Sequence, residues 1–214
     1  MPHPDPDPTP AAQRKQHWDA VYAAKPSTEV SWHQATPSVS LDLIRASGLS
    51  PAAKIIDIGG GASTLADHLL SEGFSAITVL DLAAAALDQS RHRLGPAANS
   101  IDWIPADILT WQPPTHYHLW HDRAVFHFLT DPTHRAAYLA TLNSALHPGA
   151  TVILATFALN GPERCSGLPV RRYSPETLVT ELGPQFTLVQ TATEDHHTPS
   201  GALQSFVYCR FTHK

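Results

Sequence analysis

A glycine-rich turn between an apolar run and an amphipathic segment is the feature that most constrains how this chain folds. Residues 55–63 read Ile-Ile-Asp-Ile-Gly-Gly-Gly-Ala-Ser, and leucines follow at 65, 69 and 70. A short apolar run that stops in glycines predicts a buried strand, and the leucine spacing predicts a helix after it. Glycines let the backbone approach a ligand at the N-terminus of such a helix. The pattern therefore predicts a strand, a tight turn and a helix with a binding site at the turn.

A carboxylate at the end of a second apolar run indicates the kind of ligand. Asp81 closes the run Val79-Leu80 and lies 22 positions after Gly59. In nucleotide-binding α/β folds, an acid roughly 20 residues after the glycine turn binds ribose hydroxyls. The alternative for Asp81 is an acid placed at a helix N-terminus by the helix dipole. We interpret the pair of features as a nucleotide-cofactor site.

The spacing of the glycines separates two cofactors. A dinucleotide fingerprint, G-x-G-x-x-G, requires glycine at position 64, where a threonine stands. A pyrophosphate would gain nothing from Asp57 just before the turn. S-adenosylmethionine has no phosphate but carries an ammonium group, so a carboxylate at that position fits it.

These residues resemble the first motif of the class I S-adenosylmethionine-dependent methyltransferases, in which an acid is followed by G-x-G and another small residue. Ser63 stands where glycine is commoner in that family. The resemblance covers roughly residues 40–212 and implies methyl transfer from S-adenosylmethionine. By this resemblance, the expected cofactor-binding residues are Asp57, Gly59, Gly60, Gly61, Ser63, Asp81, Leu82, Asp107, Ile108, Asp122 and Trp32. Asp107 would bind the adenine amino group, although a surface turn is the alternative for it.

The rest of the chain alternates predicted strands and helices, which implies parallel βαβ units. Strands are predicted at 54–58, 76–81, 101–104, 117–122, 150–157, 186–193 and 203–212, and the last two are separated by a loop at 194–202. Helices are predicted at 11–25, 39–47, 63–72, 83–94, 132–146 and from Ser174 onward. We expect an α/β fold with a Rossmann-like, seven-stranded, mostly parallel sheet, helices on both faces and an antiparallel final strand.

Length and composition set the domain organisation and exclude several classes of protein. A chain of 214 residues predicts one domain. Residues 1–10 alternate proline with polar residues and predict a disordered tail, and residues 11–214 form the expected methyltransferase domain. Within that domain, 11–48 is the expected helical lid and 158–173 the expected substrate loop.

The charge and the cysteine count narrow the partners and the compartment. A net charge of −5 without a long Lys/Arg run argues against nucleic-acid and anionic-membrane surfaces. The chain has two distant cysteines, no secretory signal and no apolar run near the roughly 18 residues that span a bilayer, so we expect a cytoplasmic protein. His196 and His197 are adjacent but nothing completes a ligand set, so no metal is expected. The oligomeric state stays open.

The fourth strand ends in a polar motif that supplies the catalytic candidates. Residues 120–129 read Trp-His-Asp-Arg-Ala-Val-Phe-His-Phe-Leu. The motif lacks the Asn/Asp-Pro-Pro-Tyr/Phe signature of amino-group methylation on nucleobases and glutamine. It resembles the acid-then-basic pair of thiopurine-type and some lysine-directed methyltransferases. Asp122, His121 and His127 are candidates for positioning or for a base, which is needed only if the nucleophile arrives protonated. Asp122 is alternatively the partner of the cofactor's ammonium group, and His127 a packed side chain.

The expected acceptor-binding residues are Trp32, Gln34, Arg123, Cys165 and Tyr173. Trp32 and Gln34, together with Trp18 and Tyr22, resemble the N-terminal stretch of the branch that contains thiopurine and halide or thiol methyltransferases. For Trp18 and Tyr22 the alternative is core packing, and for Cys165 it is a packed thiol.

The sequence therefore predicts a methyltransferase whose acceptor is a small molecule with a sulfur or nitrogen nucleophile. Three alternatives remain: a protein lysine methyltransferase, a nicotinamide-dependent oxidoreductase, and a module that binds the cofactor without catalysis. The identity of the acceptor is beyond what the sequence indicates.

Overall fold

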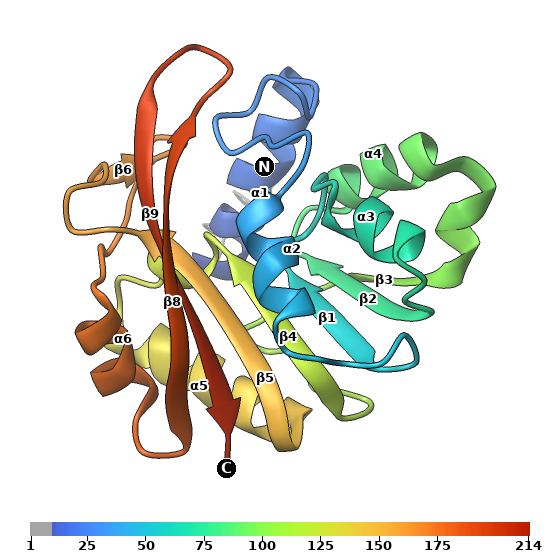
Figure 1. The fold of residues 1–214 in the computed structure, drawn as a ribbon. Helices are drawn as coiled ribbons and strands as arrows, with labels where there is room; N and C mark the ends of the chain where they lie inside the picture. Colours follow the sequence, from blue (N-terminus) through green and yellow to red (C-terminus); the bar gives the residue numbers. More distant parts are fainter. Residues whose placement is uncertain (1–9) are drawn as a thin grey trace, which may run out of the picture.

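Seven strands form one sheet in the order β3-β2-β1-β4-β5-β9-β8 in the computed structural model, which describes residues 10–214 (Figure 1). The strands are β1 (Lys54–Ile58), β2 (Ala76–Asp81), β3 (Ile101–Pro105), β4 (Tyr117–Arg123), β5 (Leu146–Phe157), β8 (Phe186–His197) and β9 (Leu203–His213). Strands β1 to β5 pair in parallel, and β9 runs antiparallel to both β5 and β8. This confirms the predicted α/β fold with an antiparallel final strand.

Helices cover both faces of the sheet, as alternate residues of β1 show. Ile55 packs in one core with Leu41 of α2 (Ser38–Arg45) and Leu69 of α3 (Leu65–Ser71), and α4 (Ala84–Leu94) joins the same core. Ile56 packs in the opposite core with Tyr138 of α5 (Pro132–Ala145), and α6 (Pro175–Leu182) joins that core. Successive side chains of a strand point to opposite faces, so β1 is buried on both sides.

Local signals explain where the helices of the second face begin. The Asp131 side chain accepts a hydrogen bond from the Thr133 amide ahead of α5, and Pro132 is the first residue of that helix. Ser174 and Thr177 form a reciprocal capping box at the start of α6. The predicted start of α6 is therefore confirmed.

The C-terminal hairpin differs from the prediction. Strand β8 continues to His197, and residues 194–197 pair with 203–206, so the connection is a turn at 198–202 rather than a loop at 194–202. The polar run Glu-Asp-His-His concealed this part of the strand, because Glu194, Asp195 and His196 form hydrogen bonds that an apolar alternation pattern does not reveal.

A bulge interrupts the same hairpin. Leu188 pairs with Phe211 and Gln190 with Arg210, so Val189 has no partner across the strands and is 50% exposed. Leu188 packs on the α5 and α6 side of the sheet, whereas Ala192 packs on the α2 side. Because of this extra residue, even-numbered side chains of β8 point to one face of the sheet before the bulge and to the other face after it.

The N-terminal segment around Trp18 and the segment directly after β5 around Cys165 lie near the carboxyl edge of the sheet. Helix α1 (Pro10–Ala24) lies between the tip of the β8–β9 hairpin and α4 (Figure 1). Of the predicted tail at 1–10, only Pro10 is among the described residues, and it begins α1. After β5, the predicted irregular segment contains a small ladder of β6 (Arg164–Cys165) and β7 (Leu168–Pro169). None of the helices within residues 10–214 combines the length and apolar character required to cross a membrane.

Candidate active site

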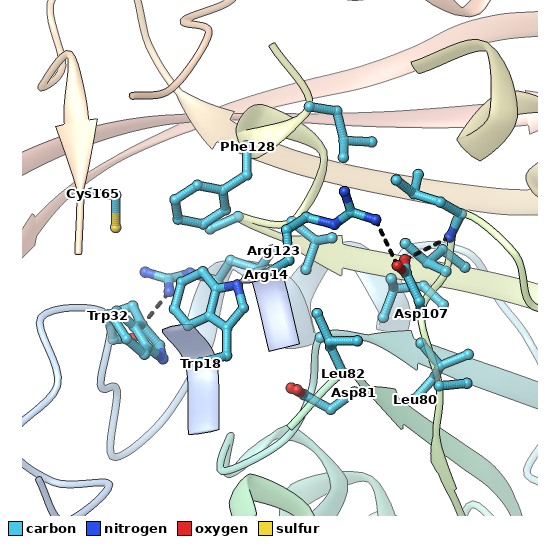
Figure 2. Close-up of a pocket in the computed structure, with 18 of the residues that line it drawn as sticks. Arg14, Trp18, Trp32, Leu80, Asp81, Leu82, Asp107, Arg123, Phe128 and Cys165 are labelled. Carbon is cyan, nitrogen blue, oxygen red and sulfur yellow. Dashed lines mark hydrogen bonds and ion pairs between the residues drawn. The ribbon is translucent and has the colours of Figure 1, made fainter. Parts of the chain in front are cut away.

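Two adjoining cavities open where the parallel strands end. They share five lining residues: Tyr22, Trp32, Ile58, Gly59 and Arg123. The larger cavity is also lined by Arg14, Trp18, Leu80, Asp81, Leu82, Ala106, Asp107, Ile108, Leu109, Ala124, Val125, Phe128, Leu129, Cys165 and Phe206. Figure 2 shows its two ends with Trp18 between them: Cys165, Phe128 and Trp32 on one side, and Asp81, Leu82 and Asp107 on the other.

The three glycines of the turn are required by close packing. Gly59 has a φ of +66°, and a Cβ there would overlap the Val125 side chain. A Cβ on Gly60 would overlap the Asp57 carboxylate, and one on Gly61 would overlap the carboxylate of Asp81. The backbone of the turn therefore lies directly against both acids, which leaves a cradle that any side chain would fill.

Asp81 ends β2 and lines the larger cavity with a side chain that is only partly satisfied. It is 7% exposed, Oδ1 accepts a hydrogen bond of 2.8 Å from the Ala83 amide, and the Gly61 backbone also hydrogen-bonds to the carboxylate. Burial raises the pKa of Asp81 to about 7, and the nearby charge of Asp57 acts in the same direction. A buried carboxylate accepts several hydrogen bonds when ionised, so a ligand with a pair of hydroxyl donors suits this position.

Asp107 lies at the same end of the larger cavity and is held by α1. Its Oδ1 accepts from the Leu109 amide at 3.0 Å, and its Oδ2 pairs with Nη2 of Arg14 at 2.7 Å (Figure 2). Leu82 and Ile108 supply apolar walls beside it. This end combines a carboxylate with an apolar lining, as a purine base requires.

A buried chain of hydrogen bonds lines the second cavity. Nδ1 of His121 lies 2.7 Å from Oδ1 of Asp57, and Nε2 of the same ring lies 2.9 Å from Oγ of Ser40. All three side chains are buried. Asp57 and Ser40 thus fix the orientation of His121, and Asp57 keeps a second oxygen next to Gly60.

Asp122 is buried beneath the cavities and lines neither of them. Its oxygens accept from the amides of Val125 and Phe126, and from the Tyr138 hydroxyl at 2.6 Å. Trp120 donates in turn to that hydroxyl. The carboxylate therefore organises the turn after β4, and this geometry gives no support to its expected contact with a cofactor or a proton.

Two further expected residues lie away from the cavities. His127 is fully buried against Phe157, and burial lowers its pKa to about 3, so the ring is neutral and enclosed. Tyr173 packs in the α5 and α6 core against Phe126. The other expected site residues line one or both cavities, except Gly61, which contributes through its packing on Asp81.

The end of the larger cavity opposite Asp81 is built around Arg123, the last residue of β4. Its Nε donates to the Tyr208 hydroxyl at 2.9 Å and its Nη1 to the Trp32 carbonyl at 3.1 Å. The guanidinium lies 4.4 Å from the centroid of the Phe206 ring. Ala124, which follows, has a φ of +74°, a rare conformation for a residue other than glycine. The strained turn and the network together set the position of this charge.

Aromatic rings form most of the remaining wall. Trp18 meets Trp32 edge-on at 5.8 Å between centroids and Phe128 at 5.1 Å. Cys165 lines the same end, and burial raises the pKa of its thiol to about 11. That thiol stays protonated at neutral pH, which favours packing over a nucleophilic role.

Several site residues were missing from the sequence prediction. No sequence motif marks four of them: Arg14, Ser40, Glu194 and Phe206. They reach the site only because the fold brings distant elements to one edge of the sheet. Within residues 10–214, no three His, Cys, Asp or Glu side chains are grouped so that they could hold a metal ion.

Comparison with known proteins agrees with this geometry. Residues 56–152 match a family model described as a methyltransferase domain. A search among curated proteins found no sequence match.

Among solved structures, the chain is similar to an S-adenosylmethionine-dependent methyltransferase from Anabaena variabilis, with 17% identity, 98% of this chain and 97% of that chain covered, and a TM-score of 0.75. It is also similar to the N-methyltransferase NodS from Bradyrhizobium japonicum in complex with S-adenosylhomocysteine, with 18% identity, coverage of 91% and 97%, and a TM-score of 0.68. A third is the 1,6-didemethyltoxoflavin-N1-methyltransferase of Burkholderia thailandensis with bound 1,6-didemethyltoxoflavin and S-adenosylhomocysteine, with 17% identity, coverage of 100% and 94%, and a TM-score of 0.70.

The fold, the glycine cradle and the matched domain define a class of enzyme. The chain carries a methyltransferase domain over residues 56–152 and has the fold of S-adenosylmethionine-dependent methyltransferases, so S-adenosylmethionine is its cofactor. The residues present fit this group, because the glycine cradle and the partly satisfied Asp81 carboxylate lie where a nucleoside can bind.

Proposed function

We propose that the protein transfers the methyl group of S-adenosylmethionine to a nitrogen or sulfur atom of a small-molecule acceptor. The observation that carries this proposal is the shape of the larger cavity, which continues from Asp81 to Phe206 under the aromatic side chains of α1 and the segment after it. An acceptor must fit beneath Trp18 and Trp32, which favours a small molecule over a macromolecule. Two of the similar structures are N-methyltransferases, and one of them contains bound 1,6-didemethyltoxoflavin.

The cofactor contacts follow from the two cavities. Asp81 would accept from the ribose hydroxyls, and Asp107 with Ile108 and Leu82 would bind the adenine. The turn from Gly59 to Ser63 and the Asp57 carboxylate would hold the methionine end. Arg14 already pairs with Asp107, so adenine binding requires that this contact be shared or given up.

The chain's own residues align and enclose the reactants. Bound S-adenosylmethionine supplies an electrophilic methyl group on a sulfonium, and the displacement is in line, so positioning and exclusion of water are the main requirements. Trp18, Trp32 and Phe128 exclude water from the larger cavity, and we assign residues 11–48 the part of a lid and 158–173 that of a substrate loop.

No side chain is assigned as a general base. His121 lines the second cavity, but both of its ring nitrogens are engaged by Asp57 and Ser40. Asp122 and His127 lie outside both cavities. The arrangement suits an acceptor whose nucleophile arrives without a proton to lose, such as a neutral amine, a ring nitrogen or a thiolate.

Calorimetry with S-adenosylhomocysteine and NAD tests the cofactor part of this proposal. We expect S-adenosylhomocysteine to bind with a Kd on the order of micromolar or tighter, as for an enclosed nucleoside, and NAD not to bind. Release of S-adenosylhomocysteine should then be measured with panels of small amines, thiols and heterocycles, and with lysine peptides as the contrasting acceptor. Binding of NAD in preference to S-adenosylhomocysteine, or turnover with lysine peptides alone, would contradict the proposal.

A further inference from the structure

Arg123 has hydrogen-bonding capacity that the described residues do not use. A guanidinium carries five N–H donors. Two of them are used, by the Tyr208 hydroxyl and the Trp32 carbonyl. Nη2 is buried and has no hydrogen-bond partner within residues 10–214, although the side chain is only 10% exposed. A buried charged donor without an acceptor is costly, so the site favours a ligand that supplies one.

Glu194 balances the charge of Arg123 without satisfying Nη2. Its Oε2 lies 3.5 Å from Nη2, too far for a good hydrogen bond. That oxygen accepts from the Tyr208 hydroxyl at 2.6 Å, and Oε1 accepts from Nε2 of Gln34 at 2.6 Å. Both carboxylate oxygens therefore already have closer donors, and Nη2 of Arg123 is left without a hydrogen-bond acceptor among residues 10–214.

The surroundings of Arg123 specify the shape of that ligand. Phe206 lies under the guanidinium, Trp32 and Phe128 supply flat apolar walls at the same end of the larger cavity, and Trp18 packs against both from the middle of the cavity (Figure 2). Aromatic walls favour a flat, conjugated ring, because offset and edge-on contacts between rings add to the burial of apolar surface.

The fixed charge also disfavours one kind of acceptor. Rings on several sides of a cavity attract cations, but here the guanidinium of Arg123 already occupies the face of Phe206, so that face is closed to an ammonium group. A protonated amine, such as a lysine side chain, is thus a poor match for this end of the site.

We infer that the acceptor is a planar conjugated ring bearing an oxygen acceptor, as a ring carbonyl, phenolate or carboxylate, which accepts a hydrogen bond from Nη2 of Arg123. This inference rests on the proposed function and names the class of its substrate. Arg123 then fixes the orientation of the ring relative to the cofactor end of the cavity.

Fragment binding to the full chain saturated with S-adenosylhomocysteine tests the inference. The probes are benzoate, 4-pyridone and benzylammonium, which share a ring and differ in the group it carries, and their Kd values are measured by ligand-observed NMR. Benzoate and 4-pyridone should bind at least about tenfold more tightly than benzylammonium, because only they accept from a charged donor. The balance between those two separates a carboxylate acceptor from a ring carbonyl.

Substitution then assigns the effect to one side chain. Arg123→Gln should weaken binding of both oxygen-bearing probes by about tenfold or more and change the affinity for S-adenosylhomocysteine less than about threefold. Arg91→Gln, which alters a half-buried arginine on α4 that lines neither cavity, is the matched control and should change neither. The ranking of the three probes on the unaltered chain tests the inference even where Arg123→Gln does not fold.

Three outcomes overturn the inference. Benzylammonium binding as tightly as benzoate would show a cation site. A loss of S-adenosylhomocysteine affinity in Arg123→Gln, with probe binding retained, would show that Arg123 holds the carboxylate of the cofactor. Binding of S-adenosylhomocysteine without any binding of benzoate or 4-pyridone would refute this inference alone, whereas failure of S-adenosylhomocysteine itself to bind would refute the proposed function.

Discussion

Asp81 and Asp122 are buried carboxylates near the carboxyl ends of two parallel strands, and the protein uses them differently. Asp81 faces the larger cavity, and in the described residues its side chain accepts from the backbone of the adjoining turn. Asp122 faces away and is surrounded by two amides and the Tyr138 hydroxyl. The first has room for donors from a ligand, and the second has none.

The pKa values of Asp81 and Asp122 do not show which of the two carboxylates binds a ligand. Burial raises the pKa of Asp81 to about 7 and that of Asp122 to about 6. Perturbed carboxyl groups cluster at functional sites, but structural networks perturb them as well. What distinguishes the binding carboxylate is the set of donors that already occupies its oxygens.

The largest expected effect is on stability, from Asp122→Ala. The change leaves the Tyr138 hydroxyl and the amides of Val125 and Phe126 without an acceptor, so the free energy of unfolding should fall by about 3 to 5 kcal/mol. Denaturant unfolding measures it, and calorimetry on the folded protein should show S-adenosylhomocysteine affinity close to that of the parent. Asp131→Ala, which removes an exposed helix cap, should cost only about 1 kcal/mol. A specific loss of cofactor binding in a stable Asp122→Ala protein would return this residue to the active site.

Asp81→Ala should have the opposite effects: a large loss of cofactor affinity and a small loss of stability. Loss of a charged acceptor for two ribose hydroxyls should weaken S-adenosylhomocysteine binding by about 1.5 to 3 kcal/mol, while the free energy of unfolding changes by about 1 kcal/mol or less. Calorimetry and denaturant unfolding on the same preparations measure both quantities. Asp88→Ala, an exposed acid on α4, is the control. Parental affinity in Asp81→Ala would reduce Asp81 to an acid at the start of a helix.

The smallest expected effect is the dependence of binding on pH. The pKa of Asp81 is about 7 in the free protein, and hydroxyl donors favour the ionised form, so the pKa falls when the nucleoside binds. Affinity for S-adenosylhomocysteine should therefore decrease as the pH falls from 8 to 6, by up to about tenfold. Asp81→Asn should abolish this dependence. A slope that persists in Asp81→Asn would assign the titration to another group.

The same raised pKa values have a consequence for stability. Both carboxyl groups bind protons more tightly in the folded protein than the ordinary value of 3.8 allows. Their contribution to stability is therefore largest below about pH 4 and is lost as the pH rises through about 6 to 7.

The nucleoside end of the site could be predicted from the sequence because its signals are local. The run from Asp57 to Ser63 joins a strand, a turn and a helix, and Asp81 follows at the end of the next strand. The spacing within one βαβ unit places such residues together. The sheet could be predicted for the same reason, since each strand and helix has its own periodicity.

The acceptor end could not be predicted, because it depends on contacts between distant segments. Glu194 was expected in a loop, but it lies in β8 and meets Gln34 and Tyr208. The use of Asp122 depends on Tyr138, a residue of the following helix. Ser40 is one of many serines, and nothing in its neighbourhood indicates that it would meet His121.

The bulge at Val189 decides which side chains of β8 face the acceptor end of the cavity. Before the bulge, even-numbered side chains point to the α5 and α6 core, and beyond it they point to the opposite face, where Glu194 meets Arg123. A strand that lost this single residue would keep its ladder with β9 but would turn Glu194 away and present its neighbours instead. The residue that faces Arg123 is thus set by the number of residues in β8 as well as by their side chains. One insertion or deletion in β8, far from the cofactor, is enough to replace Glu194 with a neighbouring residue.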